Sequence, residues 1–199
     1  MVRLPYWDPQ AEVEAARLQL HRDREFGQIA LNALFRRGTV PLPPLDGRYR
    51  GELVALILPP LLSLAGRAAL TLWMPWQGKL FDAARHEGKN LFGGRGAWLL
   101  RLFWPAYHGW RPDGRGLRGL RFYTSIAPGV LDPDLRVLRL DYNLEENPRL
   151  LVRSIFDELV QLAPGYYLGK ACMRRSGGAP RCLAFFSLTP ATGVRSASQ

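Results

Sequence analysis

Two Gly-Lys pairs, Gly78–Lys79 and Gly169–Lys170, are the first residues in this chain that could do chemistry. Glycine lets another backbone or a ligand approach closely, and a lysine ammonium beside a cavity can pair with a carboxylate or a phosphate. The alternative is that each glycine marks a bulge or bend in a strand and that each lysine faces solvent. Both interpretations remain open, and we take Lys79 and Lys170 as candidate ligand-binding residues.

Acidic residues near the ends of predicted strands could supply acid–base chemistry. A carboxyl group whose pKa is raised by burial, next to a tyrosine hydroxyl, suits proton transfer of the cyclase, isomerase or decarboxylase type. Asp157 and Glu158 are sequence neighbours, so on a strand they point to opposite faces and at most one faces the interior. Ion pairs with the many arginines are the alternative role. The candidates for catalysis are Asp141, Glu158 and Tyr167.

Positive charge is concentrated in one stretch of the chain. The protein has 27 Lys and Arg against 17 Asp and Glu, a net charge of +10. Residues 85–121 contain eight basic and two acidic residues, with aromatic residues between them. We therefore expect any anionic surface to contact Arg95, Arg101, Arg111 and Arg115. An anionic membrane surface fits this pattern, whereas nucleic acid is not favoured because no RRM, KH or cold-shock motif is present.

Composition and motif content exclude several classes of protein. A hydrophobic fraction of 47% and a charged fraction of 22% are typical of a globular chain and not of a disordered one. Cys172 and Cys182 fit no zinc spacing, and the three histidines form no HxxH or HExxH pair. No phosphate-binding GxxxxGK, dinucleotide-binding GxGxxG or hydrolase GxSxG string occurs. We expect neither a metal nor a cofactor.

The N-terminal part of the chain predicts a helix and then a strand. Asp8 is a typical N-cap before Pro9, and apolar residues recur at helical spacing, which predicts one amphipathic helix over 8–36, with Gly27 as its weak point. After a proline-rich linker, residues 47–56 alternate between polar and apolar, as a half-buried antiparallel strand does.

An apolar segment follows this strand and predicts an inserted helix over 61–74. Residues 53–76 are long enough to span a bilayer, but Arg67 and Pro59–Pro60 interrupt them. A buried helix is the expected structure, and a helix that rests on a membrane surface is the alternative.

The remaining elements are expected in the following order. Residues 79–84 predict a strand, 87–90 a turn, 118–126 and 136–142 two strands, 148–156 a short helix, and 158–162, 166–174 and 181–188 three consecutive antiparallel strands. Residues 93–119 give no clear pattern, and we expect the Ser- and Ala-rich tail 191–199 to be disordered.

The strand-rich part of the chain resembles a known fold family. It opens on Gly47-Arg-Tyr49-Arg-Gly51 and contains Pro75-Trp-Gln-Gly-Lys79, Asn147–Pro148, Asp157-Glu-Leu-Val160 and Tyr167-Leu-Gly-Lys170. The opening string is similar to the G-x-W of the calycin superfamily, the lipocalin-like β-barrels, in which an aromatic residue closes one barrel end. The whole set resembles a bacterial group with calycin-like folds and no assigned activity. The resemblance covers about residues 40–190 and implies a barrel with an interior cavity.

The sequence therefore predicts an α+β protein of one β domain with a helix packed on it. Residues 1–40 hold the N-terminal amphipathic helix, 41–190 an antiparallel calycin-like β-barrel or half-barrel with the inserted apolar helix, and 191–199 the tail. The expected function is binding of a small, mostly apolar, lipid-like ligand, with or without an anionic head, in the barrel cavity. A cavity enzyme and a peripheral membrane protein are the alternatives. No secretory signal opens the chain, so we expect a cytoplasmic protein, free or at a membrane surface.

Each candidate ligand-binding residue either occupies a strand position expected to face the barrel interior or follows a glycine within a predicted strand. They are Tyr49, Leu53, Lys79, Phe122, Leu140, Tyr142, Tyr167 and Lys170.

Cys172 and Cys182 test the register of the last two strands. If the hairpin turns about Gly177, residues at equal distance from it face each other, and the two cysteines form a cross-strand pair. Such a pair is near the geometry of a disulfide, but in a reducing compartment we expect two thiols.

Overall fold

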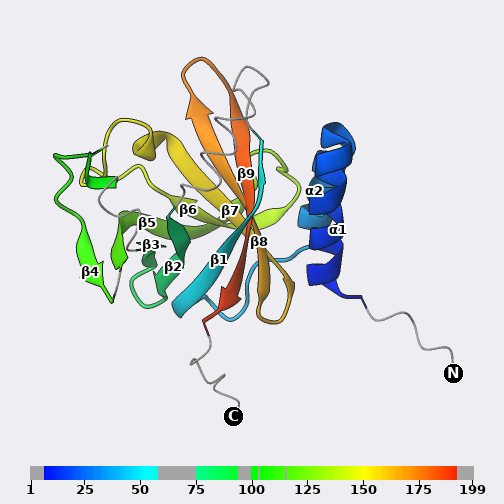
Figure 1. Cartoon of the computed structure of the whole chain (residues 1–199), viewed down its shortest axis with the longest axis horizontal. Coiled ribbons are helices and arrows are strands. Elements are labelled where there is room, and N and C mark those ends of the chain that lie inside the picture. The colour runs from blue at the N-terminus through cyan, green and yellow to red at the C-terminus, as the bar shows by residue number, and fades with distance from the viewer. Residues whose placement is uncertain (1–6, 58–74, 94–99, 103, 115, 192–199) are drawn as a thin grey trace, which may run out of the picture.

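The structure is a computed structural model of the chain, and it describes residues 7–57, 75–93, 100–102, 104–114 and 116–191 (Figure 1). Two helices come first, α1 (Pro9–Arg22) and α2 (Arg24–Arg36). The strands are β1 (Gly47–Leu56), β2 (Trp76–Asp82), β3 (Glu87–Phe92), β4 (Arg111–Asp113), β5 (Gly116–Pro128), β6 (Arg136–Asp141), β7 (Ile155–Ala163), β8 (Tyr166–Arg175) and β9 (Gly178–Pro190). A 3-10 turn, η1 (Val152–Ser154), precedes β7.

The strands close into an antiparallel barrel. Hydrogen-bonded neighbours follow the order β3-β2-β1-β9-β8-β7-β6-β5-β4, and β3 also pairs with β5. The β3–β5 pairing closes a ring of eight strands, and the short β4 adds to one end of β5. The expected α+β class with an antiparallel barrel is confirmed, and the barrel is closed, so the half-barrel alternative is wrong.

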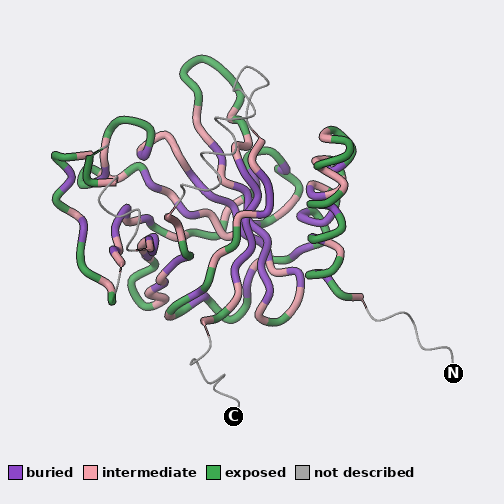
Figure 2. Tube along the Cα trace, in the orientation of Figure 1, coloured by how far each residue is buried: buried purple, intermediate pink, exposed green. Residues whose placement is uncertain are grey.

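Buried side chains form two separate cores, one inside the barrel and one between the barrel and the helices. The inner core contains aromatic residues from many strands, among them Tyr49, Phe122 and Phe186. The outer core joins Leu31 and Phe35 of α2 to side chains such as Phe185 of β9. Figure 1 shows both helices beside the barrel, and Figure 2 shows that the buried positions concentrate along the strands that they face. The strands next to the helices are therefore buried on both faces.

The N-terminal segment is a pair of helices, so the expectation of one helix over 8–36 is wrong. Asp23 has an extended backbone between α1 and α2, and its carboxylate accepts a hydrogen bond from Phe26 N, which caps the second helix. Gly27 does not break a helix but lies where the two helices touch. A Cβ atom on Gly27 would be 2.4 Å from the Leu20 backbone, so only glycine permits this approach.

Two local expectations in the barrel are also wrong. Residues 87–90 were predicted as a turn, but they belong to β3, and the turn is at 83–86. A helix was predicted over 148–156, but only η1 forms there, and β7 begins at Ile155. Asn147 does not cap a helix, because its amide donates to the carbonyl oxygens of Arg121 and Tyr142. The predicted inserted helix at 61–74 and the tail 192–199 lie outside the described residues.

The register of the last hairpin is confirmed at the cysteines. Cys172 is the cross-strand partner of Cys182, and Met173 is the partner of Arg181. Nearer the turn the register shifts and Arg175 pairs with Gly178, so the loop is shorter than predicted. Both cysteines are free thiols.

Candidate functional site

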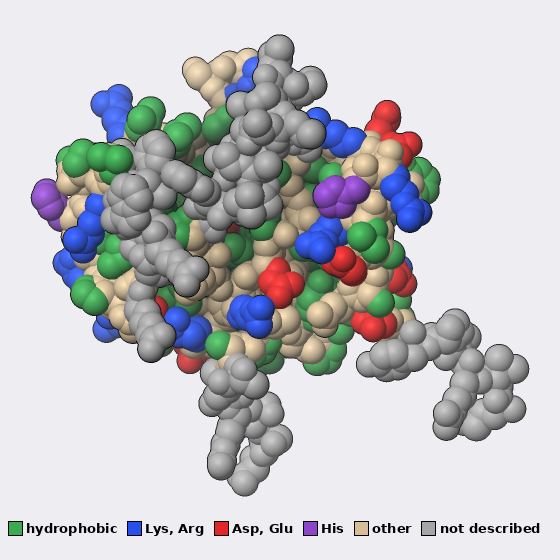
Figure 3. All heavy atoms as spheres, in the orientation of Figure 1, with side chains coloured by type: hydrophobic (Ala, Val, Ile, Leu, Met, Phe, Trp, Pro, Cys, Tyr) green, Lys and Arg blue, Asp and Glu red, His purple; other side chains and the backbone are tan. Residues whose placement is uncertain are grey.

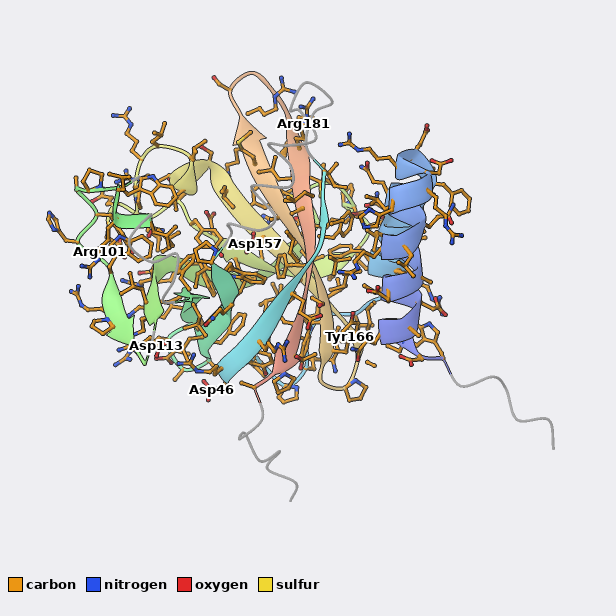
Figure 4. The ribbon with its side chains drawn as sticks, in the orientation of Figure 1. Asp46, Arg101, Asp113, Asp157, Tyr166 and Arg181 are labelled. Atoms are coloured by element: carbon orange, nitrogen blue, oxygen red, sulfur yellow. The ribbon has the colours of Figure 1, made fainter. Side chains whose placement is uncertain are left out.

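A cavity of about 270 Å³ lies inside the barrel. Its walls are almost entirely apolar, and four of its lining residues, Lys79, Asn90, Tyr142 and Asp157, form a hydrogen-bonded polar group. Figure 4 places Asp157 near the middle of the barrel. The apolar lining residues are Leu53, Trp76, Phe92, Trp104, Leu120, Leu151, Val152, Ile155, Ala171, Ala184 and Phe186.

Lys79 is the centre of the polar group and is only 2% exposed. Its Nζ donates to Oδ2 of Asp157 at 2.7 Å, to the hydroxyl of Tyr142 at 2.6 Å and to Oδ1 of Asn90 at 2.9 Å. An ammonium has three N–H bonds, so all of its donors are used. The Lys79–Asp157 contact is a buried ion pair with complete hydrogen bonding on its positive side.

The other members of the group satisfy one another. The Tyr142 hydroxyl donates to Oδ2 of Asp157 at 2.9 Å and accepts from Nδ2 of Asn90 at 3.0 Å. Nδ2 of Asn90 also donates to the Leu120 carbonyl oxygen, and the Trp76 indole donates to Oδ1 of Asn90 at 2.9 Å. Such a network holds each side chain in one position.

A bulge in β2 explains how Trp76 and Lys79 meet at the same acceptor. In a regular strand, residues three positions apart face opposite sides. The register between β2 and β3 shifts between Trp76 and Gly78, and Gly78 has a φ of 139°. A Cβ atom on Gly78 would lie 2.0 Å from the Tyr49 carbonyl oxygen, so glycine is required at this bend. The first Gly-Lys pair thus has the structural role of a bulge and also delivers its lysine to the interior.

Burial controls the protonation of the group. Desolvation lowers the pKa of Lys79, and the negative charge of Asp157 opposes this effect. Desolvation, together with the Asp157 charge, raises the pKa of Tyr142 well above its ordinary value, so Tyr142 keeps its proton. The Lys79 ammonium also lies 5.1 Å from the ring centroid of Phe122 and 5.2 Å from that of Phe186, within the range of cation–π attraction.

The candidate ligand-binding residues fall into three places. Leu53, Lys79 and Tyr142 line the cavity. Tyr49, Phe122, Leu140 and Tyr167 are buried in the inner core and are not among the described residues that line this cavity. The expectation that they form its walls is therefore wrong, because rings there pack against one another, as Tyr49 does against Tyr167 and Phe122 against Tyr142.

Lys170 lies on the other side of the barrel wall, under α2. Its Nζ donates to Oδ2 of Asp132 at 2.6 Å and lies 4.2 Å from the centroid of the Phe35 ring. Arg36 of α2 donates to the other oxygen of Asp132 at 2.8 Å. Burial alone would raise the pKa of Asp132, but hydrogen bonds from Lys170 and Arg36 outweigh it and lower the pKa. These contacts fasten the second helix to the barrel.

Two of the candidate catalytic acids also lie outside the cavity. Asp141 pairs with Arg174 at 2.7 Å and is partly exposed. Glu158 is fully buried behind the barrel wall, where its Oε1 accepts from Val130 N at 2.7 Å. The acid that faces the cavity is its neighbour Asp157, so the expectation that at most one of the two points inward is confirmed.

The predicted basic surface is only partly described. Arg101 and Arg111 are exposed, and Figure 4 shows Arg101 at the edge of the molecule, away from Asp157. Arg111 donates to the carbonyl oxygens of His108 and Trp110. Arg95 and Arg115 lie outside the described residues. On the face in Figure 3, acidic and basic side chains are intermingled over the helices.

Reasoning from the sequence missed Asn90, Trp76 and Asp157 as members of the site. Asn90 was assigned to a turn. Asp157 was one of the two neighbouring acids singled out in the sequence, but Glu158 was taken as the catalytic candidate. No residue of β7 is exposed, so the strand shows no alternation to reveal which of the two faces inward. The sequence did indicate Lys79, through its Gly-Lys pair, and it indicated Leu53 and Tyr142 through their positions in predicted strands.

Two further properties concern the described part of the chain. None of its helices has both the length and the apolar composition needed to cross a membrane. Within the same residues, no group of three or more His, Cys, Asp or Glu is placed to hold a metal ion.

Comparisons with known proteins bear on the fold. No protein-family model matches this chain, and no curated protein matches it. A protein from Thermomonospora curvata, known from its crystal structure, is similar with a TM-score of 0.51 and 15% sequence identity, over 90% of this chain and 98% of that chain. At this identity the similarity shows a shared fold and carries no information about a ligand or a reaction.

Proposed function

We propose that this protein binds a small, mostly apolar molecule inside the barrel. The observation that carries the proposal is the apolar cavity with one compact polar group in its wall. A hydrophobic pocket with a few fixed polar atoms is the usual form of a small-molecule site. Elsewhere in the barrel interior, aromatic rings such as those of Tyr49, Phe81 and Phe122 pack edge to face against one another.

The volume of the cavity, which is open on one side, indicates the size of the apolar group that it can hold. A cavity of about 150 Å³ holds benzene, so about 270 Å³ suits a molecule of about ten to twelve heavy atoms. A fused bicyclic ring or a medium-length branched chain has this size. A long-chain fatty acid or a complete phospholipid would extend beyond this volume through the open side of the cavity.

We also infer that the barrel is related to the calycins. Support comes from the Gly47-Arg-Tyr49-Arg-Gly51 opening of β1 and from the position of Tyr49 in the interior. The Tyr49 ring makes edge-to-face contacts with Phe81 at 5.4 Å and with Tyr167 at 5.7 Å. An aromatic residue that closes part of a barrel interior is the feature on which this resemblance rests.

Calorimetric titration with 2-methoxynaphthalene, which has about the expected size, tests the binding proposal. We expect saturable binding with a negative heat-capacity change, the signature of apolar burial. Ala171→Leu should weaken this binding at least roughly tenfold because it fills the cavity. Ala11→Leu makes the same chemical change on the exposed side of α1 and should leave binding unchanged. Equal affinity in the wild type and Ala171→Leu would exclude the barrel cavity as the binding site.

A cavity enzyme is the second candidate, because Asp157 and Tyr142 lie side by side on the cavity wall. The carboxylate can remove a proton from carbon, and the tyrosine hydroxyl can turn from the carboxylate and donate a hydrogen bond to the resulting oxyanion. Exchange of the α-hydrogens of 2-tetralone in heavy water, followed by NMR, tests this candidate. An exchange rate that does not exceed that of Asp157→Asn would reject it.

A further inference from the structure

The hydrogen bonds of the polar group show which kind of ligand head it can accept. Lys79 uses three N–H bonds, Asn90 uses two, and Tyr142 and Trp76 each use one. Every donor of these four side chains therefore already has an acceptor within the protein. A ligand that needs a donor from them must first break one of these bonds.

The acceptors of the group are occupied with one exception. Oδ2 of Asp157 accepts from Lys79 and Tyr142, and Oδ1 of Asn90 accepts from Lys79 and Trp76. Among the described residues, none donates a hydrogen bond to Oδ1 of Asp157. The Asp157 side chain keeps 5% of its surface exposed, and Asp157 lines the cavity. The oxygen that Lys79 and Tyr142 do not use is therefore the one available to a molecule in the cavity.

The charges of the polar group also favour a ligand head without charge. The positive charge of Lys79 is matched by Asp157 at 2.7 Å, and the other lining residues that the structure describes are uncharged. An anionic head would meet an uncompensated carboxylate oxygen, and a cationic head would lie near the Lys79 ammonium. Either charge would also lose its hydration in an apolar chamber, which is costly without a matched partner.

We propose that the ligand carries a neutral hydrogen-bond donor, a hydroxyl or an N–H group, which donates to Oδ1 of Asp157 while its apolar body fills the cavity. This inference rests on the proposed function and narrows its ligand class. Of the two possibilities that the sequence left open, a head with or without negative charge, it favours the uncharged one, because the lysine that would bind an anion is already paired with Asp157. The class is that of small apolar alcohols, phenols or amides.

Three probes of nearly equal shape test the inference by calorimetry on the full chain. They are 2-naphthol, which donates, 2-methoxynaphthalene, which does not, and 2-naphthoate, which is anionic. A hydrogen bond to a charged acceptor predicts that 2-naphthol binds roughly 10- to 100-fold more tightly than 2-methoxynaphthalene. We expect 2-naphthoate to bind more weakly than both.

Two double variants locate the preference. Lys79→Met/Asp157→Leu removes the inner charged pair, and it should still bind 2-methoxynaphthalene but lose the preference for 2-naphthol. Lys170→Met/Asp132→Leu removes the second buried pair, outside the barrel wall, and should keep the preference. The wild-type comparison stands even if the first variant does not fold.

The outcomes separate this inference from the proposed function. Binding of 2-naphthoate as tight as that of 2-naphthol, or equal affinity for 2-naphthol and its methyl ether, would overturn the inference and leave apolar binding in place. No binding of any of the three probes would overturn both.

Discussion

Lys79 and Asp157 form a buried ion pair whose energetic coupling can be measured directly. Removing one partner leaves the other charged and buried, so Lys79→Met and Asp157→Leu should each lower the free energy of unfolding by about 3–5 kcal/mol. The double variant removes both charges and should lose clearly less than the sum of the two single losses. Urea denaturation of the wild type, the two single variants and the double variant gives four free energies of unfolding, and the double-mutant cycle built from them gives the coupling energy of the pair. Strictly additive losses would show that the two side chains do not interact.

A second buried acid, Glu158, should make the stability of the protein depend on pH. Burial raises its pKa, although hydrogen bonding from Val130 N and the charge of Arg139 oppose this. An acid with a raised pKa binds its proton more tightly in the folded state than in the unfolded state. Its contribution to stability is therefore largest in acid and declines as the pH rises through the ordinary glutamate range and up to the raised value.

The variant Glu158→Gln isolates this contribution. The stability of this variant should not decline with rising pH in this way. The free energy of unfolding of Glu158→Gln, minus that of the wild type, should therefore be larger at pH 8 than at pH 4. Thermal unfolding at a series of pH values measures it. If the stability difference between the two proteins does not change with pH, the carboxyl group is not perturbed by burial.

The pair of helices makes a prediction at the scale of an element. In an exposed helix, Gly→Ala stabilises by about 1 kcal/mol through helix propensity. At Gly27, however, the new Cβ would meet the Leu20 backbone at 2.4 Å, so Gly27→Ala should instead destabilise by about 1–3 kcal/mol. Chemical denaturation decides between the signs, and a stabilised variant would mean that the helices do not pack closely at this residue.

The two facing cysteines of the β8–β9 hairpin should form a disulfide when an oxidant is added. Cys182 is half-buried whereas Cys172 is buried, and the interaction with the Cys172 thiol lowers the pKa of Cys182. Cys182 is therefore the expected nucleophile toward an added disulfide such as oxidised glutathione. Its thiolate displaces one glutathione thiol, and Cys172 then displaces the second and closes an intramolecular bridge. On the chain-entropy model this bridge would stabilise by about 2–3 kcal/mol.

Mass spectrometry follows this reaction. The expected product is the wild-type mass less two hydrogen atoms, and Cys172→Ser should stop at the mixed disulfide. Accumulation of the mixed disulfide in the wild type would contradict the facing arrangement of the two cysteines.

At the scale of the whole molecule, the sequence predicts the strands best where one face is open to solvent. β1 begins with strict alternation because Arg48 and Arg50 face water while Tyr49 faces the core. β7 shows no alternation because its outer face is also covered, by the helices at Val160 and by the loop that contains Val130 at Glu158. The sequence therefore could not tell that Asp157 points inward. The closure of the barrel depends on the pairing of β3 with β5, which no local pattern reports.

The same limit applies to β3 itself. Glu87-Gly-Lys-Asn90 has the composition of a turn, yet tertiary contacts make it a strand. Gly88 is needed because a Cβ atom would meet the Phe122 ring at 2.4 Å, and Asn90 is held by Lys79, Trp76 and Tyr142. Residues that look like turn formers are here the residues that build the site.

The most direct test of the central claim is to locate a bound molecule inside the protein. Intermolecular NOEs from 2-naphthol to methyl groups report which side chains lie within about 5 Å of the ligand. The account predicts NOEs to Leu53, Ala171 and Ala184, which line the cavity. NOEs confined to Leu42 and Ile126, which line a separate surface groove, would contradict it, as would the absence of NOEs to any cavity methyl group at saturating ligand.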